Sequence, residues 1–156
     1  MLKYYIKKGA SVDSPPDSVS KLYIDHSRTS EYRKSPFIIQ AACQGNLEIF
    51  DLLLREGCRI TDQGFAGFSK KRKNQVYTNV LGAAALNGSA KIIEYLLKKK
   101  YDYISIDQTA IERQDFNSKG AFNQEYTGYS PLMLATATGG QNIKCVRLLV
   151  EKGADL

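Results

Sequence analysis

One stretch constrains the fold of this chain more than any other feature: residues 35–57, SPFIIQAACQGNLEIFDLLLREG. Ser35-Pro36 is a typical helix start, because a serine oxygen can accept a first-turn N–H and proline loses no hydrogen bond at the first helical position. Gly45-Asn46 tolerates a left-handed turn, and Gly57 is a natural helix stop. Between them lies a helical apolar stripe made of Leu47, Ile49, Phe50, Leu52, Leu53 and Leu54. The stretch therefore predicts two short helices joined by a tight turn.

The same design returns in two further copies, at residues 78–100 and 130–156. Each copy carries a small alanine-rich segment, a turn and an aliphatic second helix; the turns are Asn87-Gly88 and Gly139-Gly140. Residues 1–13 look like the second half of a fourth copy. A helix pair of this size cannot bury its own apolar stripe and needs a neighbouring pair. The pattern thus predicts helix pairs stacked in a row.

These segments resemble ankyrin repeats, whose pattern has a Thr-Pro-Leu-His opening, paired alanines, a glycine turn, a leucine run and a Gly-Ala-Asp end. The resemblance implies an all-α solenoid of stacked helix-turn-helix pairs with extended β-hairpin-like fingers or loops. This chain departs from the pattern at the histidine, where Ile39, Gly82 and Met133 stand near the slot. Lys100-Tyr101-Asp102 replaces the Gly-Ala-Asp end in the second copy.

Composition places the chain among globular proteins. Its 156 residues fit a single domain, residues 1–156, and 43% of them are hydrophobic. No apolar run approaches the ~18–20 residues of a membrane span. Three widely spaced cysteines (Cys43, Cys58 and Cys145) do not suggest a disulfide framework and suit a reducing compartment. We therefore expect an intracellular, cytoplasmic protein, with the nucleus as an alternative through the basic run at residues 70–73.

Long links between the helix pairs are the second distinctive feature. An ordinary ankyrin array repeats about every 33 residues, whereas the helix stops at Gly9, Gly57, Lys100 and Gly153 lie 43 to 53 residues apart. The surplus falls into three predicted fingers at residues 14–34, 59–77 and 102–129. Long links in a compact domain are usually functional or disordered.

The second and third fingers have opposite charge. In the second, residues 64–68 and 75–77 are predicted to form a hairpin with Lys70, Lys71, Arg72 and Lys73 near its tip. In the third, five acidic residues outnumber two basic ones, and Tyr103, Ile104 and Ile106 alternate as in a strand that residues 125–127 would pair with. We consider two interpretations of these opposite charges: the fingers form a polarised binding face, or the neighbouring loops screen each other's charge.

Catalysis and cofactor binding find little support in the sequence. The single histidine, His26, lies in a polar link, and the cysteines have the spacing of neither a nucleophile pair nor a zinc site. The glycines Gly64 and Gly67 lack the context of a phosphate loop. We expect no enzyme activity, no metal and no cofactor.

Recognition of a protein or peptide, by the concave face and fingers, is therefore the predicted function. The candidate contacts are Lys70, Lys71, Arg72 and Lys73 for acidic groups, Phe68, Tyr77, Tyr103 and Tyr126 as aromatic anchors, and Gln40, Gln44, Leu86 and Asn87 from inner helices and turns. One alternative is nucleic-acid or anionic-lipid binding by the basic finger. Another, by fold analogy alone, is a cytosolic regulatory part of a larger channel, kinase or signalling protein. Because the last helix has an apolar outer face, we also expect a longer array.

Overall fold

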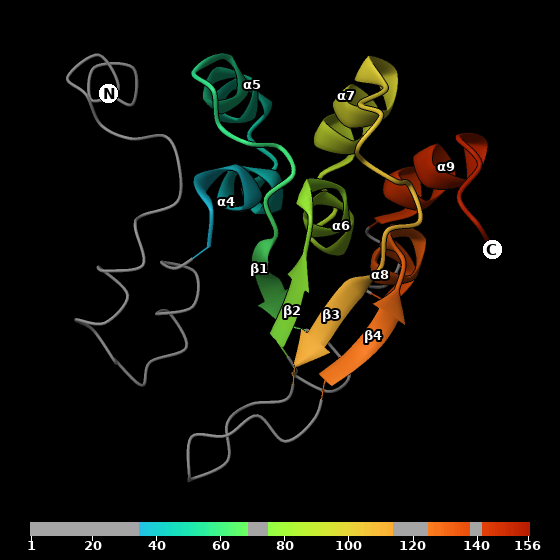
Figure 1. Ribbon diagram of the computed structural model, residues 1–156. Coiled ribbons are helices and arrows are strands. Elements are labelled where there is room, and N and C mark those ends of the chain that lie inside the picture. Colours follow the sequence, from blue (N-terminus) through green and yellow to red (C-terminus); the bar gives the residue numbers. More distant parts are fainter. Residues whose placement is uncertain (1–34, 69–74, 114–124, 138–141) are drawn as a thin grey trace, which may run out of the picture.

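Three helix pairs stand in a row in the computed structural model, which describes residues 35–68, 75–113, 125–137 and 142–156 (Figure 1). Each pair has an inner helix next to a sheet and an outer helix farther from it. The inner helices are α4 (Phe37–Gln44), α6 (Val80–Leu86) and α8 (Pro131–Ala137), and the outer helices are α5 (Leu47–Arg55), α7 (Ala90–Lys99) and α9 (Ile143–Glu151). The predicted solenoid of stacked helix pairs is thus confirmed.

Short polar residues begin the helices, as the sequence suggested, although not always in the expected role. Asn46 and Asn79 cap α5 and α6 by accepting the N–H groups of Ile49 and Gly82 at 3.1 and 2.9 Å. Ser130 accepts the Met133 N–H at 3.3 Å ahead of Pro131. Ser35 does not cap α4; its hydroxyl donates instead to the Phe65 carbonyl at 2.9 Å, and Pro36 occupies the capping position.

Alanines allow the inner helices to approach closely. Ala41 and Ala42 in α4 and the run 83–85 in α6 are at most 4% exposed. α4 packs on α6 and α6 on α8, while α7 contacts both α5 and α9. Phe50, Ile93 and Leu149, one from each outer helix, are fully buried between the layers. The pairs therefore share one continuous core along the row.

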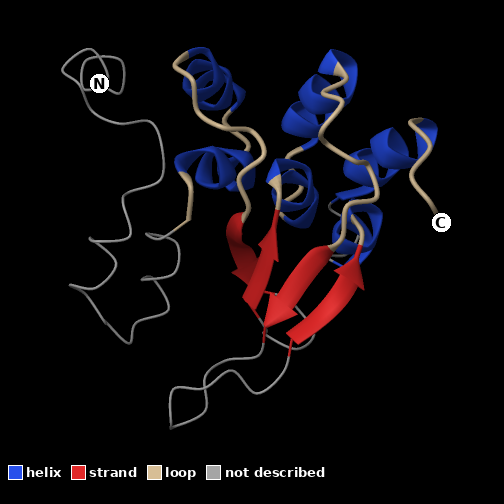
Figure 2. Cartoon of the chain, in the orientation of Figure 1, coloured by secondary structure: helices blue, strands red, loops and turns tan. Residues whose placement is uncertain are grey.

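The two described links between pairs each contribute a β-hairpin to a single sheet (Figure 2). Strands β1 (Gly64–Phe68), β2 (Gln75–Thr78), β3 (Ala110–Arg113) and β4 (Glu125–Tyr129) lie in that order, each antiparallel to its neighbour. The predicted hairpin of residues 64–68 and 75–77 is confirmed by the pairing of Phe65 with Tyr77. The second and third fingers pair through β2 and β3, so they form one surface and not two separate projections.

The strand predicted at Tyr103, Ile104 and Ile106 is wrong. Residues 101–109 form turns, and residues 125–127 pair with residues 111–113. The two isoleucines are half-buried against the core, so their apolar character serves packing. Gln108 accepts from Asn79 at 2.7 Å, and Asp107 accepts the Asp155 N–H at 3.0 Å; both contacts hold this segment on the helices.

Candidate partner-binding surface

The first hairpin is fixed to the helices through the carbonyl groups of β1. The Phe65 carbonyl accepts from Ser35, and the Ala66 carbonyl accepts both from the Cys43 thiol at 3.4 Å and from the Asn87 amide at 2.9 Å. Since these donors belong to two successive helix pairs, β1 joins the pairs together. The base of the second finger is therefore a rigid part of the fold.

The polar candidates on the inner helices lie at the turn end of the pairs. Gln44 and Asn87 are exposed and occupy equivalent places, each directly before a glycine with positive φ, Gly45 and Gly88. Gln40 is half-buried and donates to the Ser35 carbonyl at 2.7 Å. Leu86 does not fit a contact role, because it is only 6% exposed and packs in the core. The spacing of apolar residues along the helix did not show whether the Leu86 side chain points to the core or to the surface.

The aromatic candidates are divided between the sheet and the segment before it. Tyr103 is 59% exposed, whereas Tyr77 is half-buried, with its ring 5.8 Å from that of Phe65. Phe68 and Tyr126 belong to β1 and β4, and their side chains lie outside the described part of the structure. The basic run of Lys70, Lys71, Arg72 and Lys73 lies outside the described residues.

A groove of about 920 Å³ between α5 and α7 was missed by the sequence reasoning. The turn residues 44–46 are part of its lining. One wall is α5, with Leu47, Glu48, Asp51 and Arg55, and the other is α7, with Lys91, Tyr95 and Lys99. A signal for it existed, since residues 91, 95 and 99 are four apart and share one helix face.

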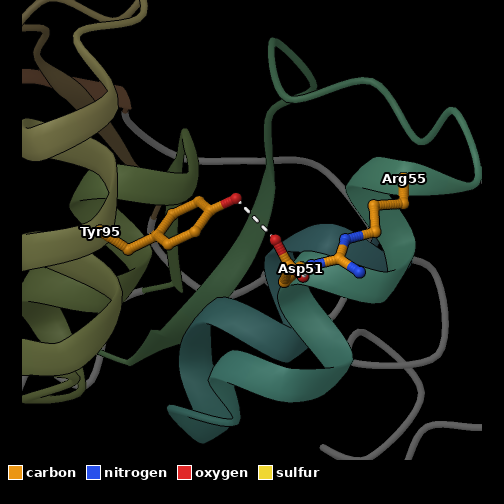
Figure 3. A network of polar contacts seen from close by, with 3 residues as sticks. All are labelled: Asp51, Arg55 and Tyr95. Atoms are coloured by element: carbon orange, nitrogen blue, oxygen red, sulfur yellow. Dashed lines mark hydrogen bonds and ion pairs between the residues drawn. The ribbon is translucent and has the colours of Figure 1, made fainter.

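A polar network crosses this groove and joins the first two pairs (Figure 3). The Tyr95 hydroxyl of α7 donates to Asp51 Oδ1 of α5 at 2.8 Å, and Arg55 forms an ion pair with the other Asp51 oxygen at 2.5 Å. Desolvation, followed by the hydrogen bond to Asp51, raises the pKa of Tyr95 well above its usual range. Tyr95 is therefore neutral at physiological pH, with its hydroxyl committed to Asp51.

Aromatic rings continue from this network to the surface. The ring of Tyr95 lies edge-on to the buried Phe50 at 6.1 Å, and Lys99 Nζ lies 5.8 Å from the Tyr95 ring centroid. Tyr101 and the exposed Tyr103 follow the helix, with their ring centroids 5.8 Å apart. Of the described residues that line the groove, Tyr95 is the aromatic one, and it stands between the exposed Lys91 and Lys99 on α7.

Chemistry at the described residues is limited. They contain no group of three or more histidine, cysteine and acidic side chains placed to hold a metal ion. The three cysteines form no disulfide, and burial raises the pKa of the Cys43 thiol to about 12. Burial raises the pKa of Cys145 as well, so both thiols are protonated and weakly nucleophilic. Among the described helices, none has the length and apolar character needed to cross a bilayer.

Comparison with known proteins gives one family. A model of ankyrin repeats, in three copies, matches residues 38–156, which include the four strands and the three helix pairs except Phe37. A search of curated proteins found no match.

Proposed function

Because the chain belongs to the ankyrin-repeat family, we propose that it is a recognition module that binds an acidic peptide segment of a partner protein. Ankyrin repeats generally mediate protein–protein interaction, and the family is typically non-catalytic. Non-catalytic binding by this chain is accordingly part of the proposal. The observation that carries it is the groove between α5 and α7.

The charges of the groove favour an anionic occupant. Asp51 is already matched by Arg55 and by the Tyr95 hydroxyl, so its acceptor capacity is largely satisfied. The remaining lining charges are Glu48 on α5 and Lys91 and Lys99 on α7, so the lining as a whole has one basic residue in excess. Lys91 and Lys99 stand about 12 Å apart at 1.5 Å per helical residue. Alternate side chains of an extended peptide lie nearly 7 Å apart, so two acidic residues four positions apart span this distance.

Aromatic surface beside the basic residues adds apolar contact. The Tyr95 ring forms part of the wall, and Tyr103 is the most exposed aromatic side chain among the described residues. Tyrosine is enriched at protein interfaces because it offers a large ring with a polar end. Tyr95 is held on α7, whereas Tyr103 lies in the turn segment 101–109 and does not line the groove.

A labelled peptide of alternating glutamate and leucine, titrated by fluorescence polarisation, tests the proposal. Lys91→Glu and Lys99→Glu are each expected to weaken binding about threefold to tenfold. Lys98→Glu, the same charge change on the same helix outside the groove lining, serves as the matched control. A counterpart peptide with glutamine in place of glutamate is expected to bind more weakly at low salt.

Two results would contradict the acidic-peptide assignment: no binding of the glutamate peptide, or equal loss in the Lys98 and Lys99 variants. A labelled single-stranded RNA and anionic vesicles run in the same assay cover the alternatives. Those alternatives depend on residues 70–73, where a Lys70→Ser, Lys71→Ser, Arg72→Ser and Lys73→Ser variant would abolish binding.

For location we propose an intracellular, cytoplasmic setting, which the absence of disulfides among the three cysteines supports.

A further inference from the structure

The two ends of the groove between α5 and α7 differ in charge. At the end next to the turns, Glu48 on α5 and Lys91 on α7 occupy equivalent places, each nine residues before the stop of its helix. At the opposite end, the lining has a basic residue on each wall, Arg55 on α5 and Lys99 on α7. An acidic group of a bound peptide is therefore attracted most strongly to this second end, here called the basic end.

An acid of the chain itself already binds one cation of the basic end. Asp51 lies one helical turn before Arg55, and its Oδ2 atom is 2.5 Å from Arg55 Nη2. The Oδ1 atom of the same carboxylate accepts the Tyr95 hydroxyl at 2.8 Å (Figure 3). A peptide carboxylate that approaches the basic end therefore competes with Asp51 for Arg55.

The ion pair of Asp51 and Arg55 is of a kind that exchanges readily. The Arg55 side chain is 75% exposed, and an exposed pair four residues apart on a helix adds little stability. A guanidinium carries several N–H donors in a planar fork that matches a carboxylate. Asp51 can keep its hydrogen bond to Tyr95 when Arg55 turns to another acid, so the exchange leaves this link between the helix pairs in place.

Stacking of the outer helices does not in itself require this network. At the next joint, between α7 and α9, Glu94 stands at the place of Asp51, six residues before the helix stop. Leu148 stands at the place of Tyr95, five residues before its stop, and a leucine side chain donates no hydrogen bond. The bridge from tyrosine to aspartate therefore belongs to the joint that contains the groove.

We propose that Asp51 is an internal competitor that sets the affinity of the groove for acidic peptides. In the complex, a carboxylate of the peptide replaces Asp51 on Arg55 and also contacts Lys99 on the opposite wall. Asp51 stays on Tyr95, close to the bound acid, and its charge opposes binding. This inference rests on the proposed function, because it assigns the acid-binding position within the same groove.

The Asp51→Asn variant tests the competition. Asparagine keeps an oxygen for the Tyr95 hydroxyl but lacks the charge that pairs with Arg55, so circular dichroism should show unchanged helix content. The labelled glutamate peptide is expected to bind this variant about threefold to tenfold more tightly than the wild type. Affinity for the glutamine counterpart should stay the same, because a neutral side chain does not compete for Arg55.

Glu48→Gln is the matched control, since it removes an acid from the same lining. Glu48 lies about 10 Å along α5 from Arg55, which is about one Debye length at 0.1 M salt. This variant should therefore change the affinity by less than about twofold. In an Arg55→Gln background, the gain from Asp51→Asn should also fall below about twofold, because the contested cation is gone.

Three results would overturn the competition: weaker or unchanged binding by Asp51→Asn, an equal gain from Glu48→Gln, or a full gain without Arg55. Failure of the wild type to bind the glutamate peptide would contradict the proposed function instead. The exchange at Arg55 is then decided by NMR, with N-acetylglutamate amide as the probe and N-acetylglutamine amide as the neutral control.

In this titration the Arg55 Nε–H signal should shift with the glutamate probe, and the midpoint should lie about threefold or more lower in Asp51→Asn. A signal that does not move, or equal midpoints in the two proteins, would overturn the proposal.

Discussion

Replacement of Gly88 by alanine is the most informative single change in the stacking of the repeats. Gly88 has a φ of 74°, in the left-handed region, and a Cβ there would overlap the Asn142 Oδ1 atom of the following pair. Asn142 is only 7% exposed, and its amide donates to the Ala85 carbonyl at 3.2 Å. The amide therefore cannot move aside without loss of this contact between pairs.

Two costs add in the Gly88→Ala variant. The left-handed conformation costs an L-residue about 1–2 kcal/mol, partly offset by about 0.4–1 kcal/mol from the less flexible unfolded chain. Overpacking against Asn142 adds about 1–3 kcal/mol. We expect the free energy of unfolding to fall by about 2–4 kcal/mol.

Gly153→Ala isolates the first cost. Gly153 has a φ of 88°, yet nothing lies within 4 Å of a Cβ at that position. This variant should lose about 1 kcal/mol or less. In an Asn142→Ala background, the cost of Gly88→Ala should fall to the same value, because the overlapping atom is gone.

Urea unfolding followed by far-UV circular dichroism measures the stability of the wild type, the three single variants and the Asn142→Ala/Gly88→Ala double variant. The reasoning fails if Gly88→Ala and Gly153→Ala lose equal stability. It also fails if removal of the Asn142 side chain leaves the cost of Gly88→Ala unchanged. Either result would mean that the turn glycine serves its backbone conformation alone and not the close approach of the next pair.

Three further changes test the core and the links between pairs. Phe50→Ala empties a fully buried site and should cost about 3–5 kcal/mol in urea unfolding; a loss under about 1 kcal/mol would mean that the core is not continuous there. Tyr95→Phe removes the hydrogen bond to Asp51 and should cost about 1 kcal/mol, but nothing further in an Asp51→Ala background. Burial raises the pKa of the Cys43 thiol from 9.0 to about 12, so the thiol's contribution to stability is complete below pH 9 and declines as pH rises toward 12. The Cys43→Ser variant keeps a donor for the Ala66 carbonyl. As the pH is raised from about 8 to about 10.5, this variant should therefore lose less unfolding free energy than the wild type. Equal losses would mean that the Cys43 thiol does not cause the pH dependence.

The helix pairs could be predicted from the sequence because the residues that specify a helix, its cap and its apolar stripe, lie within a few positions of one another. Asn46 caps the helix that follows it, and the leucine run supplies the face that the next pair buries. The basic and acidic fingers were also predicted to be neighbours, and the pairing of β2 with β3 confirms this. Strand positions in the third finger were less predictable, since alternation at residues 103–106 is shared by a strand and by a loop that packs two isoleucines.

The groove shows the limit of reading one chain segment at a time. Asp51 and Tyr95 are 44 residues apart, and only the stacking of α7 on α5 brings them within 2.8 Å. The sequence by itself determined the repeat, the order of its helices and the apolar faces, because these depend on spacing along a helix. The tertiary structure alone decided which polar groups meet between pairs and that Leu86 turns inward. Those outcomes depend on the distance between elements, and periodicity within one element carries no information about it.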